Sequence, residues 1–289
     1  QGTAISASQT MDNIDDLVKN KNEEFRYYTN SHNKDLHQDI NASNQEFDEL
    51  NTKIDLSEYI SYKDDQWINA AENDSFITSI LSNSISEELR NIKSFYNESY
   101  AYDLFGEFFI TNKYGLIIGS TQKTSDYYQA DETWWIEAKE KGEYYGDIEF
   151  DYSANIYSLP ISVSINDRNG TFLGVFKAVW NIQEIIDLID NANQFIGQKY
   201  YTSESIHLLD TSGRIIYSTG SFDFLQNKSS WFELFDDNNK ASFFILHDET
   251  YEAEEKLIAY TYSSFQEDEI DHQWLLIIDF DTANIFMPV

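Results

Sequence analysis

The residues best suited to chemistry are aromatic and acidic side chains that lie close together between residues 124 and 151. The candidate ligand-binding residues are Tyr127, Glu132, Trp134, Trp135, Tyr145, Asp147 and Asp151. Aromatic faces attract cations, and a nearby carboxylate adds to that attraction. An ammonium group suits such a site, above all a quaternary one, which cannot donate hydrogen bonds. The stretch therefore predicts a small cationic or quaternary amine as the ligand.

The helical candidates also have ordinary structural explanations. Glu132 lies where a helix is expected to begin, and the helix dipole favours acidic residues there whether or not a ligand binds. Consecutive helix residues point about 100° apart, so Trp134 and Trp135 cannot line one wall of a pocket equally. We expect one of the two indoles to line the pocket and the other to pack in the core.

The remaining candidates have similar alternatives. Tyr127 suits a packed core or its rim. Side chains alternate along a strand, so Tyr145, Asp147 and Asp151 are expected on one strand face. That face either directs Asp147 at a ligand or forms a solvated acidic stripe, and the sequence leaves both possibilities open.

No pattern in the sequence points to catalysis or to a bound cofactor. The chain has no Gly-x-Ser-x-Gly elbow, no phosphate-binding loop and no His-Glu-x-x-His. It contains no cysteine, which excludes disulfides, thiol nucleophiles and cysteine metal sites. His207 lies in an apolar stretch and is expected to be a packed core residue. We expect no enzyme activity, no metal site and no cofactor.

The composition limits the class of partner. The 289 residues include 51 acidic and 19 basic side chains, which gives a formal net charge of −32. Such a surface repels polyanions, so nucleic acid is excluded as a partner. No apolar run approaches the roughly 18 residues needed to cross a bilayer. The chain begins at Gln1 rather than Met, and we expect both of its ends to have been cut from a longer protein.

The first of the elements that must position these residues is a helical segment, residues 1–98. Apolar residues such as Ile14, Val18, Phe25 and Phe47 recur with the spacing of a helix face, and Gly and Pro are absent from residues 3–105. The pattern predicts a helix over about 8–52, roughly 65 Å long, and further helices near 57–70 and 75–97. An ordinary amphipathic or coiled-coil helix and a signalling stalk beside a membrane fit this segment equally well.

Residues 99–197 have the pattern of an α+β lobe. Apolar runs at 108–110 and 116–118 flank a turn that contains Gly115, which predicts a hairpin. A helix is expected over 131–141, ending at Gly142. The later elements expected are strands at 144–150, 156–165 and 172–180 and a helix at 183–192. This order predicts an antiparallel sheet with helical cover.

Residues 198–289 repeat the opening of that lobe. The stretch 206–219 lies 98 residues after 108–121. The pairs that match are Gly115/Gly213, Ile117/Ile215, Ile118/Ile216, Ser120/Ser218 and Thr121/Thr219. Later strands are expected at 241–247, 255–263 and 273–280. We interpret this part as a second, smaller copy of the lobe that lacks a counterpart of the Trp-Trp helix.

With these elements in place, the chain resembles the double Cache (dCACHE) family, the extracytoplasmic sensors of histidine kinases and chemotaxis receptors. The resemblance rests on residues 124–138, with Asp-Glu-x-Trp-Trp-x-x-Ala at their centre, on 144–151 and on 173–182. It implies an α+β fold with a long N-terminal helix and two PAS-like lobes, each an antiparallel sheet with helical cover. The helical segment would be 1–98, the membrane-distal lobe 99–197 and the membrane-proximal lobe 198–289.

The resemblance also implies where a ligand binds. It places a small-molecule pocket in the distal lobe, with Trp134 in its wall. Amino-acid-binding members hold the ligand carboxylate with Arg-x-Trp-Tyr-x-x-Ala and its amine with Tyr-x-Asp and a further Asp. The residues that match here are Trp134, Trp135, Ala138, Tyr145 and Asp147. Glu132 stands at the Arg position, and the second Asp position falls at or near Val179, so an α-amino acid is not expected as the ligand.

We therefore expect the extracytoplasmic, ligand-sensing domain of a cell-membrane receptor, most readily a sensor histidine kinase. Transmembrane helices would precede residue 1 and begin near Ile285, and the N-terminal helix would mediate a homodimer. The alternative is a secreted or surface acidic module that binds carbohydrate or mediates adhesion, or a hydrolase. Adhesion predicts exposed tryptophans, and a glycoside hydrolase needs two carboxyl groups in a cleft, one with a raised pKa.

Overall fold

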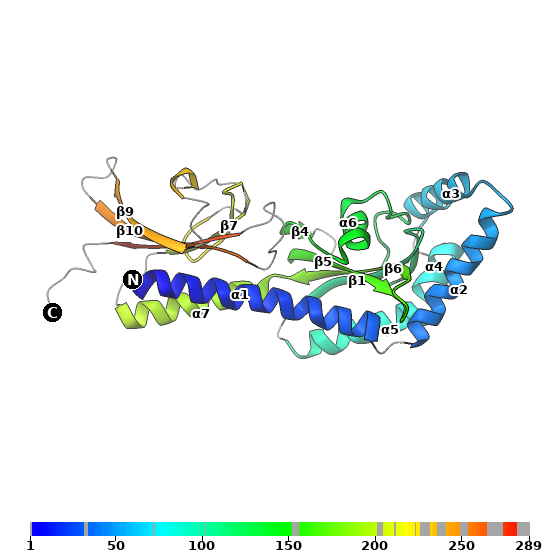
Figure 1. Ribbon diagram of the computed structural model, residues 1–289, viewed down its shortest axis with the longest axis horizontal. Coiled ribbons are helices and arrows are strands. Elements are labelled where there is room, and N and C mark those ends of the chain that lie inside the picture. The colour runs from blue at the N-terminus through cyan, green and yellow to red at the C-terminus, as the bar shows by residue number, and fades with distance from the viewer. Residues whose placement is uncertain are drawn as a thin grey trace. The chain divides into compact units, whose positions relative to one another are not determined.

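The computed structural model describes residues 2–31, 34–71, 73–100, 102–151, 156–200, 205–210, 212–222, 224–225, 232–235, 241–248, 254–264 and 274–281. The chain forms two compact units, one of Lys21–Ile182 and one of Gln1–Asn20 with Gln183–Val289. Each unit contains one antiparallel sheet with helices (Figure 1). The α+β class predicted from the sequence is confirmed. The units group residues by contact, and the division of the chain at residues 98 and 197 stays a prediction.

The N-terminal helix is shorter than predicted. The elements are α1 (Gly2–Arg26), a π-helical turn η1 (Tyr27–Ser31) and α2 (Lys34–Asn51). The prediction of one α-helix over 8–52 is therefore wrong. Asn30, within the turn, donates to the carbonyl of Ser164 at 3.2 Å and accepts from the amide of Asn166 at 2.9 Å. These hydrogen bonds to a strand hold residues 27–31 in the wider π-helical turn. The cause is a tertiary contact, and no helix-breaking residue in this part of the sequence indicates it.

Three further helices complete the helical segment. They are α3 (Leu56–Asn69), α4 (Ser75–Leu81) and α5 (Ser84–Glu98). The helix predicted near 57–70 is confirmed, whereas the helix predicted over 75–97 is split in two. Asn83 separates the halves because its side chain caps α5, accepting from the amide of Ser86 at 2.9 Å. The same side chain donates to the carbonyl of Ile118 at 2.7 Å and so attaches the cap to the sheet.

The sheet of the unit Lys21–Ile182 has the strand order β2-β1-β6-β5-β3, with β4 also paired to β5. The strands are β1 (Phe105–Asn112), β2 (Ile117–Ser120), β3 (Glu143–Tyr145), β4 (Glu149–Asp151), β5 (Ile156–Asn166) and β6 (Phe172–Asn181). Helix α6 (Thr133–Lys141) ends at Gly142, whose φ is 93°, as the sequence predicted. The predicted strand over 144–150 is two short strands instead. Their ladder to β5 stops opposite Pro160, which has no N–H to donate.

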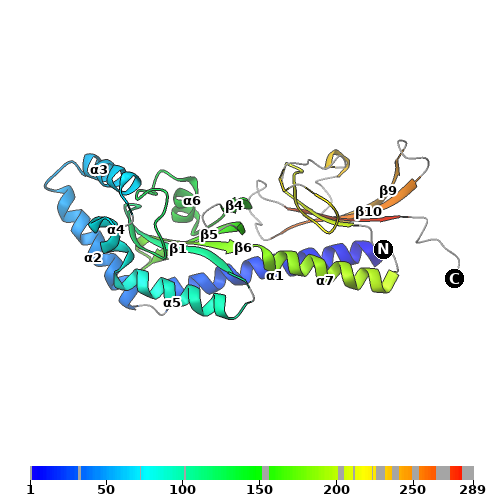
Figure 2. The same ribbon diagram turned by 180° about the vertical axis from the view of Figure 1, so that it is seen from behind.

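Successive residues of β1 and β6 point to opposite faces of this sheet. Phe109 lies on the α6 face, edge-on to Trp134 with ring centroids 5.6 Å apart. Phe108 and Phe176 lie on the other face, where their ring centroids are 6.1 and 5.3 Å from that of Phe25 on α1. Helices α5 and α6 cover opposite sides of the sheet (Figure 2). Both faces of the sheet are therefore packed.

The other unit is built on a five-stranded sheet with the order β8-β7-β11-β10-β9. Its elements are α7 (Gln183–Tyr200), β7 (Ser205–Leu209), β8 (Ile215–Ser218), the 3-10 helix η2 (Phe232–Leu234), β9 (Ala241–Asp248), β10 (Glu254–Tyr262) and β11 (Leu275–Asp281). The buried Asp15 of α1 accepts from the amide and the hydroxyl of Ser264, at 2.6 and 2.7 Å. These bonds join the first part of α1 to the chain that follows β10. No helix within the described ranges has the length and apolar character to cross a membrane.

The two sheets share one topology and one register. Each places the first strand of its N-terminal hairpin beside its last strand. Phe109 faces Ser120 in the first hairpin, and His207 faces Ser218 in the second, so the registers agree at an offset of 98 residues. The register of both hairpins shifts at a β-bulge, between Ile110 and Thr111 in the first and between Leu208 and Leu209 in the second. The agreement supports the predicted duplication, with the short η2 standing where the first copy has α6.

The hairpin turns repeat at the level of single hydrogen bonds. Asn112 in the first turn, and Asp210 in the second, accept through a side-chain oxygen from the backbone amides two and four residues later. Gly115 and Gly213 both have a φ of 79°, in the left-handed region that favours glycine. The two glycines that match in the sequence therefore occupy the same place in the same kind of turn.

Candidate functional site

A cavity of about 340 Å³ lies on the α6 face of the first sheet. Its lining comes from the segment before α6, from α6, from β3, β4 and their connection, and from β5 and β6. The lining residues with chemical importance are Asp126, Glu132, Trp134, Asp147, Glu149 and Lys177. We call this cavity the motif pocket, because the predicted ligand-binding residues Glu132, Trp134 and Asp147 line it.

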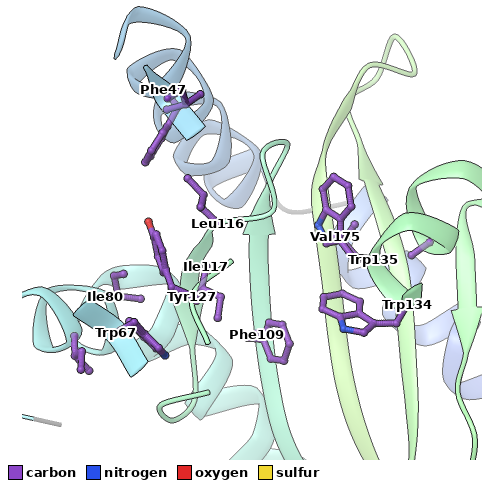
Figure 3. Close-up of a cluster of buried hydrophobic side chains, with 13 residues drawn as sticks. Phe47, Trp67, Ile80, Phe109, Leu116, Ile117, Tyr127, Trp134, Trp135 and Val175 are labelled. Atoms are coloured by element: carbon purple, nitrogen blue, oxygen red, sulfur yellow. The ribbon is translucent and has the colours of Figure 1, made fainter. Parts of the chain in front are cut away.

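The indole of Trp134 forms an inner wall of the motif pocket. Helix α6 places it between helix and sheet, where it is 7% exposed (Figure 3). The ammonium nitrogen of Lys177, on β6, lies 4.3 Å from the centroid of the Trp134 ring. At that distance the ring and the ammonium attract each other. The aromatic face that we expected to receive the cation of a ligand thus already contacts a cation of the protein.

Trp135, its neighbour on α6, does not line the motif pocket. Its Nε1 donates to the hydroxyl of Thr111 at 2.8 Å, and its ring lies edge-on to Phe172 with the centroids 5.8 Å apart. One indole therefore lines the pocket and the other packs in the core, as the angle between consecutive helix residues requires.

Four carboxyl groups line the motif pocket, those of Asp126, Glu132, Asp147 and Glu149. Glu132 is the N-cap residue of α6, but its side chain makes no capping hydrogen bond. Asp126 accepts from the hydroxyl of Ser125 at 3.1 Å and from the side-chain amide of Gln129. Burial raises the pKa of Asp126 above its usual value, against these hydrogen bonds. In the described part of the chain, the lining of this pocket is therefore strongly acidic, with Lys177 as its one lysine.

Two ionisable residues that we did not predict belong to this region, Lys177 on β6 and Glu107 on β1. Burial lowers the pKa of Lys177, and the carboxyl of Glu107 opposes that shift. Burial raises the pKa of Glu107 to about 7, and Lys177 opposes it in turn. Each is the one charged residue of an otherwise uncharged strand, FGEFFITN or FLGVFKAVWN. That pattern could have revealed them, because a buried charge needs a partner.

Tyr127, predicted as a pocket residue, lies in the hydrophobic core beyond β2. Its ring centroid is 5.7 Å from that of Trp67 and 5.1 Å from that of Phe76. Burial raises the pKa of its hydroxyl. Its amide donates to Asp64 at 2.7 Å, which fixes the segment that leads to α6.

Tyr145 and Asp151 also lie outside the lining of the motif pocket. The hydroxyl of Tyr145 accepts from the side-chain amide of Asn22 at 2.6 Å, so Tyr145 connects β3 with α1. Asp151, on β4, contributes to the raised pKa of Glu107. The prediction that both share one strand face with Asp147 is wrong, because β3 ends at Tyr145 and Asp147 lies in the connection before β4.

Comparisons with known proteins show similarity in structure. No protein-family model and no curated protein matches the sequence. The sensory domain of the Campylobacter jejuni chemoreceptor Tlp3 (CcmL) is 16% identical, with a TM-score of 0.53 over 99% of this chain and 96% of that one. The ligand-binding domain of Tlp3 in complex with L-valine is 16% identical, with a TM-score of 0.52 over 99% of this chain and 95% of that one.

A third similar structure is the ligand-binding domain of the Pseudomonas fluorescens chemoreceptor CtaA in complex with L-serine. It is 12% identical, with a TM-score of 0.43 over 86% of this chain and 99% of that one. The Tlp3 matches extend over nearly the whole length of both chains. They show that this chain has the fold of chemoreceptor sensory domains, the double Cache architecture that its sequence resembles.

Proposed function

We propose that this chain is the extracytoplasmic ligand-sensing domain of a transmembrane receptor, with the motif pocket as its binding site. The observation that carries the proposal is the pocket itself, which is lined by four carboxyl groups, Lys177 and the indole of Trp134. The fold shared with the sensory domain of Tlp3 supports the receptor assignment. Transmembrane helices outside residues 1–289 and a homodimer through the N-terminal helix belong to the same proposal.

The charges of the motif pocket favour a ligand with a protonated primary or secondary amine. Such a group donates hydrogen bonds to carboxylates such as those of Asp147 and Glu132, and charge-assisted bonds of this kind are strong. A quaternary ammonium has no hydrogen to donate and depends on an aromatic face. Lys177 already lies against that face at Trp134. We therefore propose a primary or secondary amine rather than the quaternary one that the sequence suggested.

Lys177 adds a second requirement. Among the described residues it is the one basic side chain that lines the motif pocket, and it faces acidic neighbours on several sides. A ligand with a carboxylate or another acceptor would contact this ammonium while its amine lies at the carboxyl groups. An amino-acid-like zwitterion, against which the missing arginine argued, thus becomes compatible with the pocket, because Lys177 supplies a cation from another strand.

The test is a ligand screen on the whole chain followed by calorimetric titration. A panel of L-amino acids, diamines, choline and glycine betaine should raise the melting temperature most with a zwitterion that has a protonated primary or secondary amine. Asp147→Asn and Lys177→Gln should each weaken that ligand about tenfold, because each removes one charge-assisted contact. Glu140→Gln is the matched control: it is exposed on α6, does not line the pocket and should leave the affinity unchanged.

Stabilisation by choline alone, with Lys177→Gln equally responsive, would contradict the proposed ligand class and leave the sensor assignment standing. A ligand that is indifferent to both Asp147→Asn and Lys177→Gln would remove the motif pocket as the site.

The adhesion alternative expects tryptophans on the surface. Those that the structure describes are Trp67, Trp134, Trp135, Trp180 and Trp274. Their exposed fractions are all 7% or less. Side chains buried to this degree cannot form an exposed aromatic strip, so the described part of the chain favours the sensor over the adhesion module.

A further inference from the structure

A second cavity, of about 730 Å³, lies on the opposite face of the same sheet. It is bounded by the end of α1, by η1, by α5, and by Phe108 of β1 and Phe176 of β6. We call it the back pocket. Its volume falls in the range of about 300–1,000 Å³ that is usual for small-molecule sites. Strand β6 contributes to both pockets from its two faces, since Phe176 lines the back pocket and Lys177 the motif pocket.

Aromatic rings dominate the lining of the back pocket. Its inner wall includes Phe25, Phe108 and Phe176, and the ring centroid of Tyr28 lies 6.1 Å from that of Phe176. Tyr27 and Phe95, also in the lining, are 59% and 68% exposed. These exposed rings leave apolar area in water that a bound molecule would cover.

The charged residues in the described lining of the back pocket are acidic. Glu24 and Glu88 line it, and among the residues that the structure describes, no lysine, arginine or histidine does. The hydroxyl of Tyr96 donates to Glu24, which orients that carboxyl beside the rings. Aromatic faces with carboxylates beside them form the environment that binds organic ammonium ions.

Two other cavities of this unit differ from the back pocket because each contains a lysine beside an aromatic ring. In the motif pocket the ammonium of Lys177 lies over Trp134. In a third cavity, of about 440 Å³ between α2, α3 and α4, the ammonium of Lys63 lies 4.1 Å from the ring centroid of Phe76. In each of these two cavities, the ammonium of a lining lysine therefore already contacts a lining aromatic ring. The back pocket combines rings and carboxylates, and its described lining contains no basic residue.

We propose that the back pocket binds an organic cation, a substituted ammonium ion that carries an apolar group. Its ammonium lies toward Glu24 and Glu88, and its apolar group packs between α5 and the sheet. This site goes beyond the proposed sensing function and does not depend on it. Because η1 and the end of α1 line the pocket, the bound cation contacts the point where the N-terminal helix leaves α-helical geometry.

The probe for this site is benzyltrimethylammonium, titrated calorimetrically into the whole chain at physiological salt so that general surface attraction is screened. The neutral comparison is benzyl alcohol, which has the ring without the charge. We expect saturable binding of the cation and none of the alcohol over the same range. Glu24→Gln, Glu88→Gln and Tyr27→Ala should each weaken the cation roughly three- to tenfold. Tyr27 is exposed, so its replacement is compatible with folding even if a buried variant is not.

The matched control is Glu87→Gln, which makes the same change of charge on an exposed neighbour in α5 that does not line the pocket. It should leave the affinity unchanged. Equal weakening by Glu87→Gln would mean attraction to the acidic surface and would overturn the proposal, as would the absence of saturable binding or equal binding of benzyl alcohol. Loss of the probe in Asp147→Asn but not in Glu24→Gln would place it in the motif pocket, which also overturns the proposal. None of these results bears on the zwitterion titration that tests the proposed function.

Discussion

Glu107 and Lys177 bring opposite charges onto neighbouring strands inside an apolar sheet. Lys177 pairs with Phe109 in the register of β1 with β6. Glu107 is two residues before Phe109 on β1, so Glu107 and Lys177 lie on the same face of the sheet. Burial disfavours the charged form of both, and each partly relieves the other. Asp126, Glu132 and Glu149 act on Lys177 as well. The charge state of the motif pocket is therefore set by a group of residues rather than by one side chain.

The raised pKa of Glu107 predicts a dependence of stability on pH. Its pKa is about 7 in the folded protein and close to 4.5 when unfolded, so the folded state holds the proton more tightly. The stability that this group contributes is present below pH 4.5 and is lost as the pH rises to about 7. Glu107→Gln keeps the shape and removes the titration. The variant should be more stable than the natural chain at pH 8, by roughly 3 kcal/mol, and similar to it at pH 4.5.

Urea denaturation at the two pH values measures this difference. The control is Glu149→Gln, an exposed acid of the same pocket, which should not change the pH dependence by a comparable amount. A Glu107→Gln chain that loses stability with rising pH as steeply as the natural chain would show that Glu107 is not the group responsible.

At the scale of elements, the hairpin turn of β1 and β2 combines backbone conformation with close packing. Gly115 has a φ of 79°, and a Cβ at this position would lie 2.4 Å from the Cβ of Ala130. Gly170 has nearly the same backbone, with a φ of 81°, but no atom lies within 4 Å of a Cβ built there. The two glycines thus separate the effect of the backbone from that of packing.

Gly115→Ala should therefore cost more than Gly170→Ala. The left-handed backbone alone costs an alanine about 1 kcal/mol, which is the expected loss at Gly170. The clash with Ala130 should bring the loss at Gly115 to roughly 3 kcal/mol or more. Chemical denaturation of both variants is the measurement. Equal losses would mean that the turn moves away from Ala130 without cost.

Element boundaries show which structural causes are local. The ends of α6 and the hairpin turns follow from residues within a few positions, such as Gly142 and Gly115, and were predictable. The break between α4 and α5 depends on a bond from Asn83 to Ile118, and η1 depends on bonds from Asn30 to β5. Partners so distant in the chain leave no periodic signal, so the helices were predicted to run on.

The same distinction applies to the candidate site. Glu132, Trp134 and Asp147 lie within one stretch of chain, and their clustering in the sequence led to the pocket. Lys177 comes from β6, and only the pairing of strands brings it beside Trp134. Without it, the pocket looked suited to a quaternary cation. The lone charge in the strand FLGVFKAVWN indicates a buried lysine, but not that it lies beside Trp134.

At the scale of the whole molecule, each unit has its own sheet and its own core. A destabilising substitution in one unit should therefore leave the stability of the other unit unchanged. Gly213→Ala places a Cβ 2.4 Å from Cγ of Phe232 in the second unit. It should raise amide hydrogen exchange in β7 and β11 while β1 and β6 keep their protection, and Gly115→Ala should do the reverse. Mass-resolved hydrogen exchange on both variants is the test. Equal loss of protection in both sheets from either variant would show that the units unfold together.

The matching registers of the two sheets also allow their buried charges to be compared position by position. Positions on the first hairpin correspond at an offset of 98 residues, and positions on the last strand at 100, since Val179 pairs with Glu107 as Asp279 pairs with Ser205. Glu107 and Lys177 have no charged counterpart in the second copy, where Ser205 and Ile277 stand. That copy has Asp279 instead, with Lys256 at 3.0 Å and His207 at 3.9 Å. The two sheets thus share one register but hold their buried ions at different positions, so the charges can change without changing the pairing of the strands.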